Sequence, residues 1–296
     1  SAEKAKNSMY SHGGALGKEG KYEEAAQVFS DLGTYLDSRE KYSEYTYLHA
    51  QMLKSEGEYK AAAAVYESIP DYSDSAVMYC ECMYLYAQQL NGEVRHDEAA
   101  AIFDSLGDYA DSTEMAKESR YLLAGKFHEA GEHGKAYEQY AALDGYSDSA
   151  SLGLRCGYEH AQGLGAAGEH MAAADVYTSL GSYEDSAERA KACYYTHACQ
   201  LFDSGDKDGA RRVFVLLGTY SDSAARVDEI DYLRAGEYFA AGEYENAAAA
   251  YEQLGDYADS AALALESRYQ QATADWASGG QSRKSPSAGC PTGTAG

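Results

Sequence analysis

The sequence predicts an all-α solenoid of seven 37-residue helix-turn-helix repeats followed by a C-terminal capping helix. A strict period, two residue columns that keep it at helical spacing, and the presence of only 3 Pro in 296 residues predict this fold. An Asp-Ser pair marks the period at Asp37-Ser38, Asp74-Ser75, Asp111-Ser112, Asp148-Ser149, Asp185-Ser186, Asp222-Ser223 and Asp259-Ser260. The same register holds alanine at Ala25, Ala62, Ala99, Ala136, Ala173, Ala210 and Ala247, and an aromatic residue at Phe29, Tyr66, Phe103, Tyr140, Tyr177, Phe214 and Tyr251.

The first element of the pattern is a short amphipathic helix, predicted over residues 22–32 of the first repeat. Ala25, Phe29 and Leu32 follow the i, i+4, i+7 spacing that places side chains on one helix face. Gly33 then ends the helix, because glycine readily adopts the backbone conformation that closes a last turn.

The second element is a longer helix, predicted over residues 38–56. This segment contains no proline, starts at an Asp-Ser pair able to cap free helix amides, and ends at Gly57. N-capping is therefore favoured over a calcium or phosphorylation site for the Asp-Ser column. A helix pair of this size leaves one apolar face uncovered, so the repeats are expected to stack.

The period divides residues 1–278 into a repeat array. Its repeats 1 to 7 are residues 1–37, 38–74, 75–111, 112–148, 149–185, 186–222 and 223–259, and residues 260–278 form the capping helix. Asp275 stands in a column that is otherwise mostly apolar, which is typical of a cap. Residues 279–296 change to a Gly/Ser/Pro/Thr-rich composition, which predicts a tail or linker.

Read from its long helix, repeat 2 runs Tyr47-x-x-Ala50-x-x-Leu53-x-x-x-Gly57-x-Tyr59-x-x-Ala62-x-x-x-Tyr66-x-x-Ile69. This pattern resembles the tetratricopeptide repeat throughout residues 1–278. It is also similar to bacterial arrays with a Leu-Gly-Asp-Tyr-x-Asp-Ser signature. The period is 37 rather than about 34, and the family's Trp column holds Met9, Thr46, Met83, Arg120, Gly157, Tyr194 and Asp231. The resemblance implies a right-handed superhelix, a concave groove lined mainly by the longer helices, and a scaffold role without a defined reaction.

Charge and hydropathy exclude several classes of partner. There are 48 acidic against 24 basic residues, a net charge of -24 that repels nucleic acid and anionic lipid surfaces. No apolar run is long enough for a membrane span. We therefore expect a soluble protein without nucleic acid or membrane partners, whose own partner is a protein or peptide with basic residues.

Candidate groove residues form two columns. The first is the column tyrosines Tyr10, Tyr47, Tyr84, Tyr121, Tyr158, Tyr195, Tyr232 and Tyr269, and the second becomes aromatic at Phe202, Phe239 and Trp276. Stacked phenols suit an extended peptide or a sugar chain. The alternative is that each ring packs on the neighbouring repeat, which identity in every repeat favours.

The cysteines and histidines do not show the spacing of a zinc site. Cys156 and Cys193 share a column in adjacent repeats, and His96, His133 and His170 share another. Helices about 8–10 Å apart argue against a disulfide between Cys156 and Cys193. Neighbouring repeats are also expected to be too far apart to share a metal. We expect buried thiols, which favour a reducing compartment, and turn or surface histidines. No metal, no cofactor, no catalytic residue and no enzymatic activity are expected.

These observations favour a protein-binding scaffold that holds an extended or helical segment in its groove. The alternative is a structural subunit that associates head to tail into a filament, through its ends or through the tail 279–296. A filament would point to an extracellular location. The organism, suggested to be bacterial by the resemblance, and the compartment are not determined by the sequence.

Overall fold

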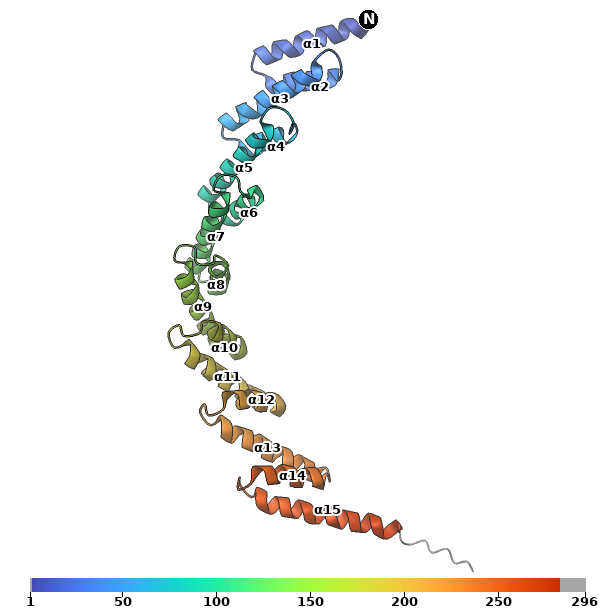
Figure 1. Ribbon diagram of the computed structural model, residues 1–296, viewed down its shortest axis with the longest axis vertical. Helices are drawn as coiled ribbons and strands as arrows, with labels where there is room; N and C mark the ends of the chain where they lie inside the picture. Colours follow the sequence, from blue (N-terminus) through green and yellow to red (C-terminus); the bar gives the residue numbers. More distant parts are fainter. Residues whose placement is uncertain (1, 283–296) are drawn as a thin grey trace, which may run out of the picture. The chain divides into compact units, whose positions relative to one another are not determined.

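A computed structural model describes residues 2–282, and the side chains of residues 2–277. Within this range it has fifteen α-helices and no strand, and the helices follow one another in chain order within each part of the chain (Figure 1). The all-α solenoid is confirmed. The helices are α1 (Ala2–Lys18), α2 (Tyr22–Leu32), α3 (Ser38–Ser55), α4 (Tyr59–Glu67), α5 (Ser75–Gly92), α6 (His96–Leu106), α7 (Ser112–Glu129), α8 (His133–Ala141), α9 (Ser149–Ala166), α10 (His170–Ser179), α11 (Ser186–Asp203), α12 (Lys207–Leu217), α13 (Ser223–Ala240), α14 (Tyr244–Leu254) and α15 (Ser260–Ser282).

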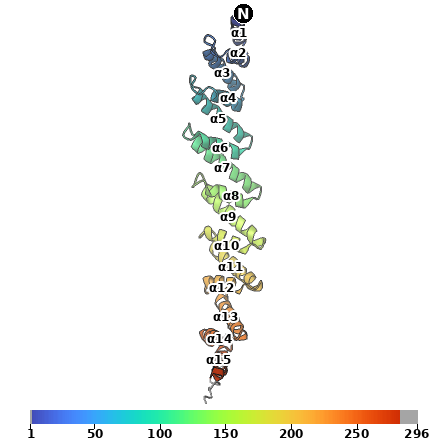
Figure 2. The same cartoon turned by 90° about the vertical axis from the view of Figure 1, so that its right-hand side faces the viewer.

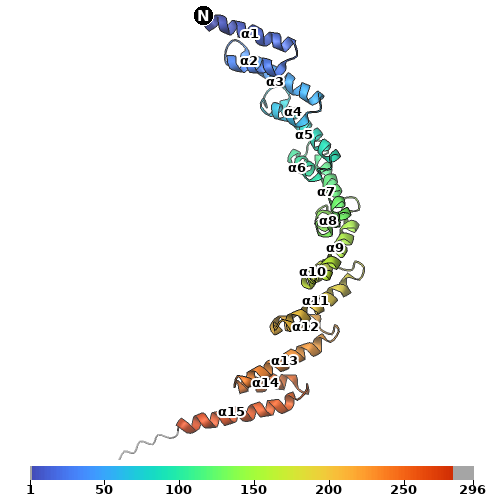
Figure 3. The ribbon, with the colours of Figure 1, turned by 180° about the vertical axis from the view of Figure 1, so that it is seen from behind.

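The chain divides into two compact parts, Ser1–His160 and Ala161–Gly296, with the boundary inside α9. In the first part the helices pack in consecutive pairs, from α1 with α2 to α7 with α8. The short helices α2, α4, α6 and α8 lie along one side of this part, and the long helices lie along the other (Figures 1 and 3). In the second part the helices from α10 to α15 again pack in consecutive pairs.

In repeats 2, 3, 4, 6 and 7, whose core clusters are described, a residue of the following repeat, or of the capping helix after repeat 7, closes the core. Ala50 of α3 and Ala62 of α4 are fully buried, and their small side chains let the two helices approach closely around the ring of Tyr66. Cys82 of α5 completes this cluster from repeat 3. In the second part, Ile230 of α13 closes the cluster of Ala198, Ala210 and Phe214 in the same way.

The connections from short to long helix share one backbone conformation. The residue before each Asp of the Asp-Ser pair has a positive φ near 50°, and none of these residues is glycine: Leu36, Ser73, Ala110, Ser147, Glu184, Ser221 and Ala258. The connections after α2, α4 and α6 project to the same side of the first part (Figure 2). The Asp-Ser spacing predicts the turn, but the left-handed residue inside it has no sequence signal, because its side chain differs in most repeats.

In the five long helices with a described N-cap, the Asp of the pair does not cap through its side chain as expected. Asp74 occupies the N-cap position of α5, but its carboxylate makes no capping hydrogen bond. Its partner Ser75 is fully buried, and its hydroxyl donates back to the Tyr72 carbonyl at 2.6 Å. Only Asp206, before the short helix α12, caps a helix through its side chain, by accepting from the Gly209 amide at 2.8 Å, among the helices with a described N-cap.

The last helix is longer than predicted. Helix α15 ends at Ser282, whereas the sequence pattern ends the capping helix at residue 278. The beginning of the predicted tail is thus helical. The rest of that tail, residues 283–296 with Cys290, lies outside the described residues. None of the helices within residues 2–282 is both long and apolar enough to cross a membrane.

In one of the turns between a long and a short helix, the glycine found in the other repeats is replaced. The turn residues Gly20, Gly57, Gly131, Gly168, Gly205 and Gly242 have φ between 75° and 92°. Repeat 3 has Val94 at this position, with φ of 65°. A β-branched side chain is strained in this left-handed region, because its Cβ substituents crowd the backbone.

We therefore expect Val94→Gly to stabilise the protein by about 1 kcal/mol, because it relieves this strain. The matched control is Val77→Gly, since Val77 is an exposed residue inside α5 and glycine there destabilises a helix by about 0.5–1 kcal/mol. Thermal unfolding followed by circular dichroism checks the opposite signs. A lower melting temperature for Val94→Gly would contradict the strained turn.

Candidate functional site

The column tyrosines connect successive repeats. The Tyr121 hydroxyl donates to Asp148 Oδ1 at 2.6 Å. Asp148 directly precedes α9, the long helix of the next repeat. The same bond joins Tyr10 to Asp37, Tyr47 to Asp74, Tyr84 to Asp111, Tyr195 to Asp222 and Tyr232 to Asp259. The aspartates expected to cap helices therefore accept from the preceding repeat instead.

The tyrosine rings are held between two other aromatic rings. Tyr84 meets Phe103 of its own short helix edge to face, with ring centroids 5.4 Å apart. Its other edge meets Tyr109 of the following connection at 6.1 Å. This arrangement explains why tyrosine recurs in the column, since the contact needs both a ring and a hydroxyl.

The hydrogen bond between a column tyrosine and its aspartate shifts the pKa values of both groups. The hydrogen bond to the Asp259 carboxylate raises the pKa of Tyr232 to about 12, because the bond is lost when the phenol ionises. The bond from Tyr47 lowers the pKa of Asp74, and the bond from Tyr195 lowers that of Asp222. Both shifts favour the neutral phenol with the ionised carboxylate.

The remaining groove candidates lie in different surroundings. Phe202 and Phe239 are half-buried against the cores of repeats 6 and 7. Tyr158 is a half-buried residue of α9. Tyr269 and Trp276 of α15 are 66% and 81% exposed, and no described helix follows α15 to cover them.

A pocket with mainly apolar lining opens between α10, α11 and α12. Its volume is about 540 Å³, and Met171, Tyr194, Val213, Leu216 and Leu217 contribute most of its large side chains. We call it the apolar pocket. Leu216 is 86% exposed and Met171 is 43% exposed, so both side chains are available at its mouth.

The apolar pocket exists because two side chains depart from the repeat pattern. At the Leu216 position the other repeats have polar or small residues: Asp31, Ser68, Ser105, Ala142, Ser179 and Gln253. At the Met171 position they have Glu23, Lys60, Asp97, Gly134, Asp208 and Glu245. The pocket residues were not among the predicted groove residues. The sequence signal for them is an apolar residue in a column that is otherwise polar or small.

The Tyr194 side chain forms one wall of the apolar pocket. Its hydroxyl donates to Asp175 Oδ1 at 2.7 Å, which fixes the ring against the pocket. Burial raises the pKa of this phenol, and the bond to Asp175 adds to the shift. Lys191 at the edge of the pocket is paired with Glu188 at 2.8 Å.

The neighbouring pocket between α12, α13 and α14 has a different chemistry. Its volume is about 660 Å³, and the guanidinium of Arg211 crosses it to bind both carboxylate oxygens of Asp231, at 2.6 and 2.7 Å. The corresponding residues of the preceding repeat are Ala174 and Tyr194. The same backbone therefore supports an apolar surface in one repeat and an ion pair in the next.

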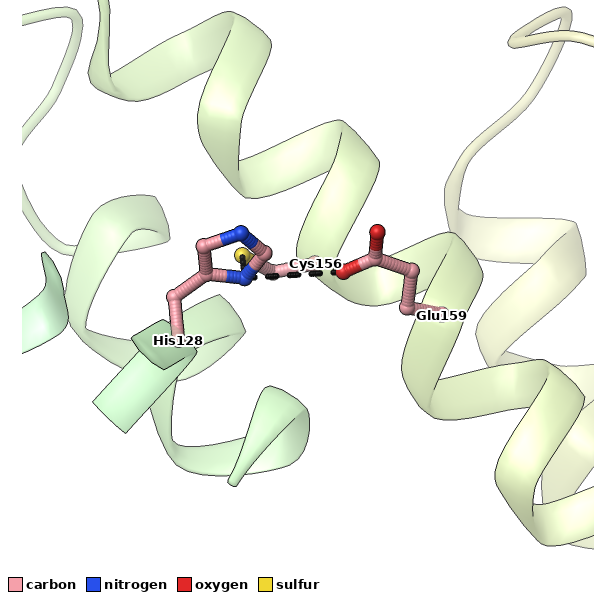
Figure 4. A group of neighbouring side chains, drawn as sticks. All are labelled: His128, Cys156 and Glu159. Atoms are coloured by element: carbon pink, nitrogen blue, oxygen red, sulfur yellow. Dashed lines mark hydrogen bonds and ion pairs between the residues drawn. The ribbon is translucent and has the colours of Figure 1, made fainter. Parts of the chain in front are cut away.

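A polar group joins repeats 4 and 5 within the first part of the chain. His128 Nδ1 lies 3.3 Å from Cys156 Sγ and 3.5 Å from a Glu159 carboxylate oxygen (Figure 4). One donor atom from each of these residues lies within 4.8 Å of the others, an arrangement that could hold a metal ion. The expectation that neighbouring repeats are too far apart to share a metal is wrong here, because the end of α7 lies directly against α9.

Comparison with known proteins finds no matching protein-family model and no matching curated protein.

We expect Tyr121→Phe to destabilise the protein by about 1 kcal/mol, because the bond to Asp148 is lost while the ring stays. The same substitution at Tyr269 is the matched control, since its exposed phenol ends the column. Chemical denaturation with a helical signal checks both variants. Equal stability of Tyr121→Phe and the wild type would contradict a structural role for the column hydroxyls.

Proposed function

We propose that the chain is a non-enzymatic protein–protein interaction scaffold built from tetratricopeptide-like repeats, and that it binds an extended or helical segment of another protein. The observation that carries this proposal is the apolar pocket between α10, α11 and α12. Exposed apolar side chains grouped around a concavity are typical of sites that receive an anchor residue.

The dimensions of the apolar pocket suit a side chain of a partner protein. A volume of about 540 Å³ is within the range of small binding sites, and it exceeds the volume of one large apolar side chain. Leu216 gains most from being covered, since 86% of it faces water. An apolar anchor inserted beside Leu216 and Met171 would remove both side chains from solvent.

The charge of the chain favours a basic partner. The net charge of -24 creates a negative field that raises the association rate of cationic segments and weakens with salt. Lys191 at the pocket edge is already paired with Glu188, so it does not offset this field locally. We therefore propose a segment with one large apolar residue flanked by Lys or Arg.

The column tyrosines support the scaffold rather than the contact with the partner. Their hydroxyls donate to the aspartates and their rings pack on aromatic neighbours, so ligand binding would compete with contacts between repeats. For this reason we place the docking site at the apolar pocket. A peptide-binding groove along the tyrosines stays a prediction from the sequence.

We expect Leu216→Ser to reduce peptide binding at least tenfold without loss of stability, because serine already stands at this position in repeats 2, 3 and 5. The measurement is fluorescence anisotropy with labelled peptides carrying a Leu or Phe anchor flanked by Lys or by Glu. The basic peptides should bind more tightly, and the preference should decrease with salt.

Leu265→Ser is the matched control, because Leu265 is an exposed leucine of α15 outside the apolar pocket. Equal loss of binding in both variants, or binding of acidic and basic peptides alike, would contradict this docking site.

A second candidate function is self-assembly into a filament, favoured by the exposed face of α15. Tyr269 and Trp276 correspond to Tyr232 and Phe239 of repeat 7, which pack against α14. A helix of a second copy that covers this face would continue the packing and produce a head-to-tail contact that does not close.

Trp276 is the single tryptophan of the chain, so its fluorescence reports directly on that contact. Self-assembly should shift the emission to shorter wavelength as protein concentration rises, together with an increase in light scattering. Trp276→Ser should remove the scattering increase. An emission maximum that stays typical of exposed tryptophan at all concentrations would contradict assembly through α15.

A further inference from the structure

The polar group between repeats 4 and 5 replaces a different contact found one repeat earlier. Between repeats 3 and 4, the Asn91 amide donates to Ser119 Oγ at 2.7 Å, and His96 Nδ1 lies 3.0 Å from Asn91 Oδ1. The equivalent positions of the next interface hold His128 for Asn91, Cys156 for Ser119 and His133 for His96. A hydrogen-bonded amide and hydroxyl have become an imidazole and a thiol.

Glu159 is the third departure at this interface. Four other repeats have leucine at its position, namely Leu48, Leu85, Leu122 and Leu233. The Glu159 side chain is about one-third exposed, and its carboxylate contacts both histidines: His128 Nδ1 at 3.5 Å and His133 Nδ1 at 3.1 Å. All the residue types that bind zinc in proteins, namely Cys, His and a carboxylate, thus occur together at this interface.

The distances from His128 Nδ1, and the distance between the two imidazole rings, match those around one tetrahedral zinc ion. With Zn–N, Zn–O and Zn–S bonds of about 2.0–2.3 Å, two ligand atoms on one zinc lie about 3.3–3.6 Å apart, and two imidazole ring centres lie about 5 Å apart. His128 Nδ1 is 3.3 Å from Cys156 Sγ and 3.5 Å from the carboxylate, and the His128 and His133 rings are 5.4 Å apart. Cys156 Sγ and the Glu159 carboxylate lie within 4.8 Å of each other.

The geometry does not suit a nucleophilic cysteine. A catalytic Cys–His–carboxylate arrangement uses one imidazole nitrogen for the thiol and the other for the carboxylate. Here the thiol and the carboxylate both approach Nδ1 of His128, as Figure 4 shows, and Cys156 is fully buried. Atoms that converge on one point fit a bound cation better than a relay of protons.

Two buried atoms of the group also lack hydrogen bonds. His133 Nδ1 and Glu159 Oε2 are shielded from solvent and, although 3.1 Å apart, are not aligned as donor and acceptor. Buried polar atoms normally have a partner, because an unsatisfied one costs about 1–3 kcal/mol. A cation held between them would satisfy both lone pairs.

Arg155 is the one neighbour that opposes metal binding. Its guanidinium contacts His128 Nε2, which must carry a proton when Nδ1 binds a metal. The Arg155 side chain is half exposed, so it is free to turn toward solvent. Removing its guanidinium should therefore favour the metal-bound form.

We propose that His128, His133, Cys156 and Glu159 bind one zinc ion, which clamps α7 and α8 of repeat 4 to α9 of repeat 5. Binding releases the proton of the Cys156 thiol to solvent and forms four bonds to the metal. The ion would stabilise this interface, because it binds only when both repeats are folded and stacked.

The test uses the full chain after treatment with a chelator and a phosphine reductant. Titration with Zn²⁺ in competition with a metal indicator should give one ion per chain and a higher melting temperature. Co²⁺ should give a thiolate-to-metal charge-transfer band, which reports the Cys156 ligand directly. His128→Ala, His133→Ala and Glu159→Gln should each weaken Zn²⁺ binding by about tenfold or more, and Arg155→Gln should strengthen it.

Cys156→Ser should abolish the cobalt band and keep the fold, since the buried residues Ser119 and Ser267 already stand at this position in other repeats. Cys193→Ser is the matched control, because Cys193 shares the column while Gly165 and Thr196 replace the histidine and the glutamate. Absence of the band in the wild type, a band that survives Cys156→Ser, or equal Zn²⁺ affinity in all variants would overturn the proposal.

Discussion

The structure depends on the contact between successive repeats, because each described core cluster includes a residue of the following repeat or of the capping helix. Cys82 and Ile230 complete the clusters of the repeats that precede them, and six of the column tyrosines extend the contact with a hydrogen bond to the next aspartate. In such an array, stability is close to a sum of repeat and interface contributions. A substitution at one interface therefore changes mainly the stability of the two repeats that form it.

Two kinds of column can be distinguished in the array: columns whose residues stabilise the contact between repeats, and columns in which single residues form a local site. Residues that recur in every repeat, such as the column tyrosines, recur because each repeat needs the same ring and hydroxyl. The candidate binding sites occur where a residue differs from the others in its column. Leu216 and Met171 replace polar or small residues at the apolar pocket, and Glu159 replaces leucine beside two histidines.

Equivalent interfaces differ in chemistry although their backbones are alike. Asn91 and Ser119 share a hydrogen bond, His128 and Cys156 share a close contact of potential metal ligands, and Phe202 contributes to an apolar core at the corresponding place in repeat 6. The small alanines of the core set the helix spacing, so the side chains at the edge are free to vary. A solenoid can in this way combine a uniform framework with local sites of unrelated character.

The sequence by itself determined the fold class and the period, because alanine and aromatic columns at helical spacing allow few other packings. It predicted α2 at 22–32 and α3 at 38–56 to within a residue. The tertiary structure alone decided that Asp111 accepts from Tyr84 instead of capping α7, since the donor lies 27 residues away. It also brought His128 beside Cys156 and Met171 beside Leu216, because these neighbours belong to different repeats and the stacking of helices, rather than the sequence spacing, sets their distance.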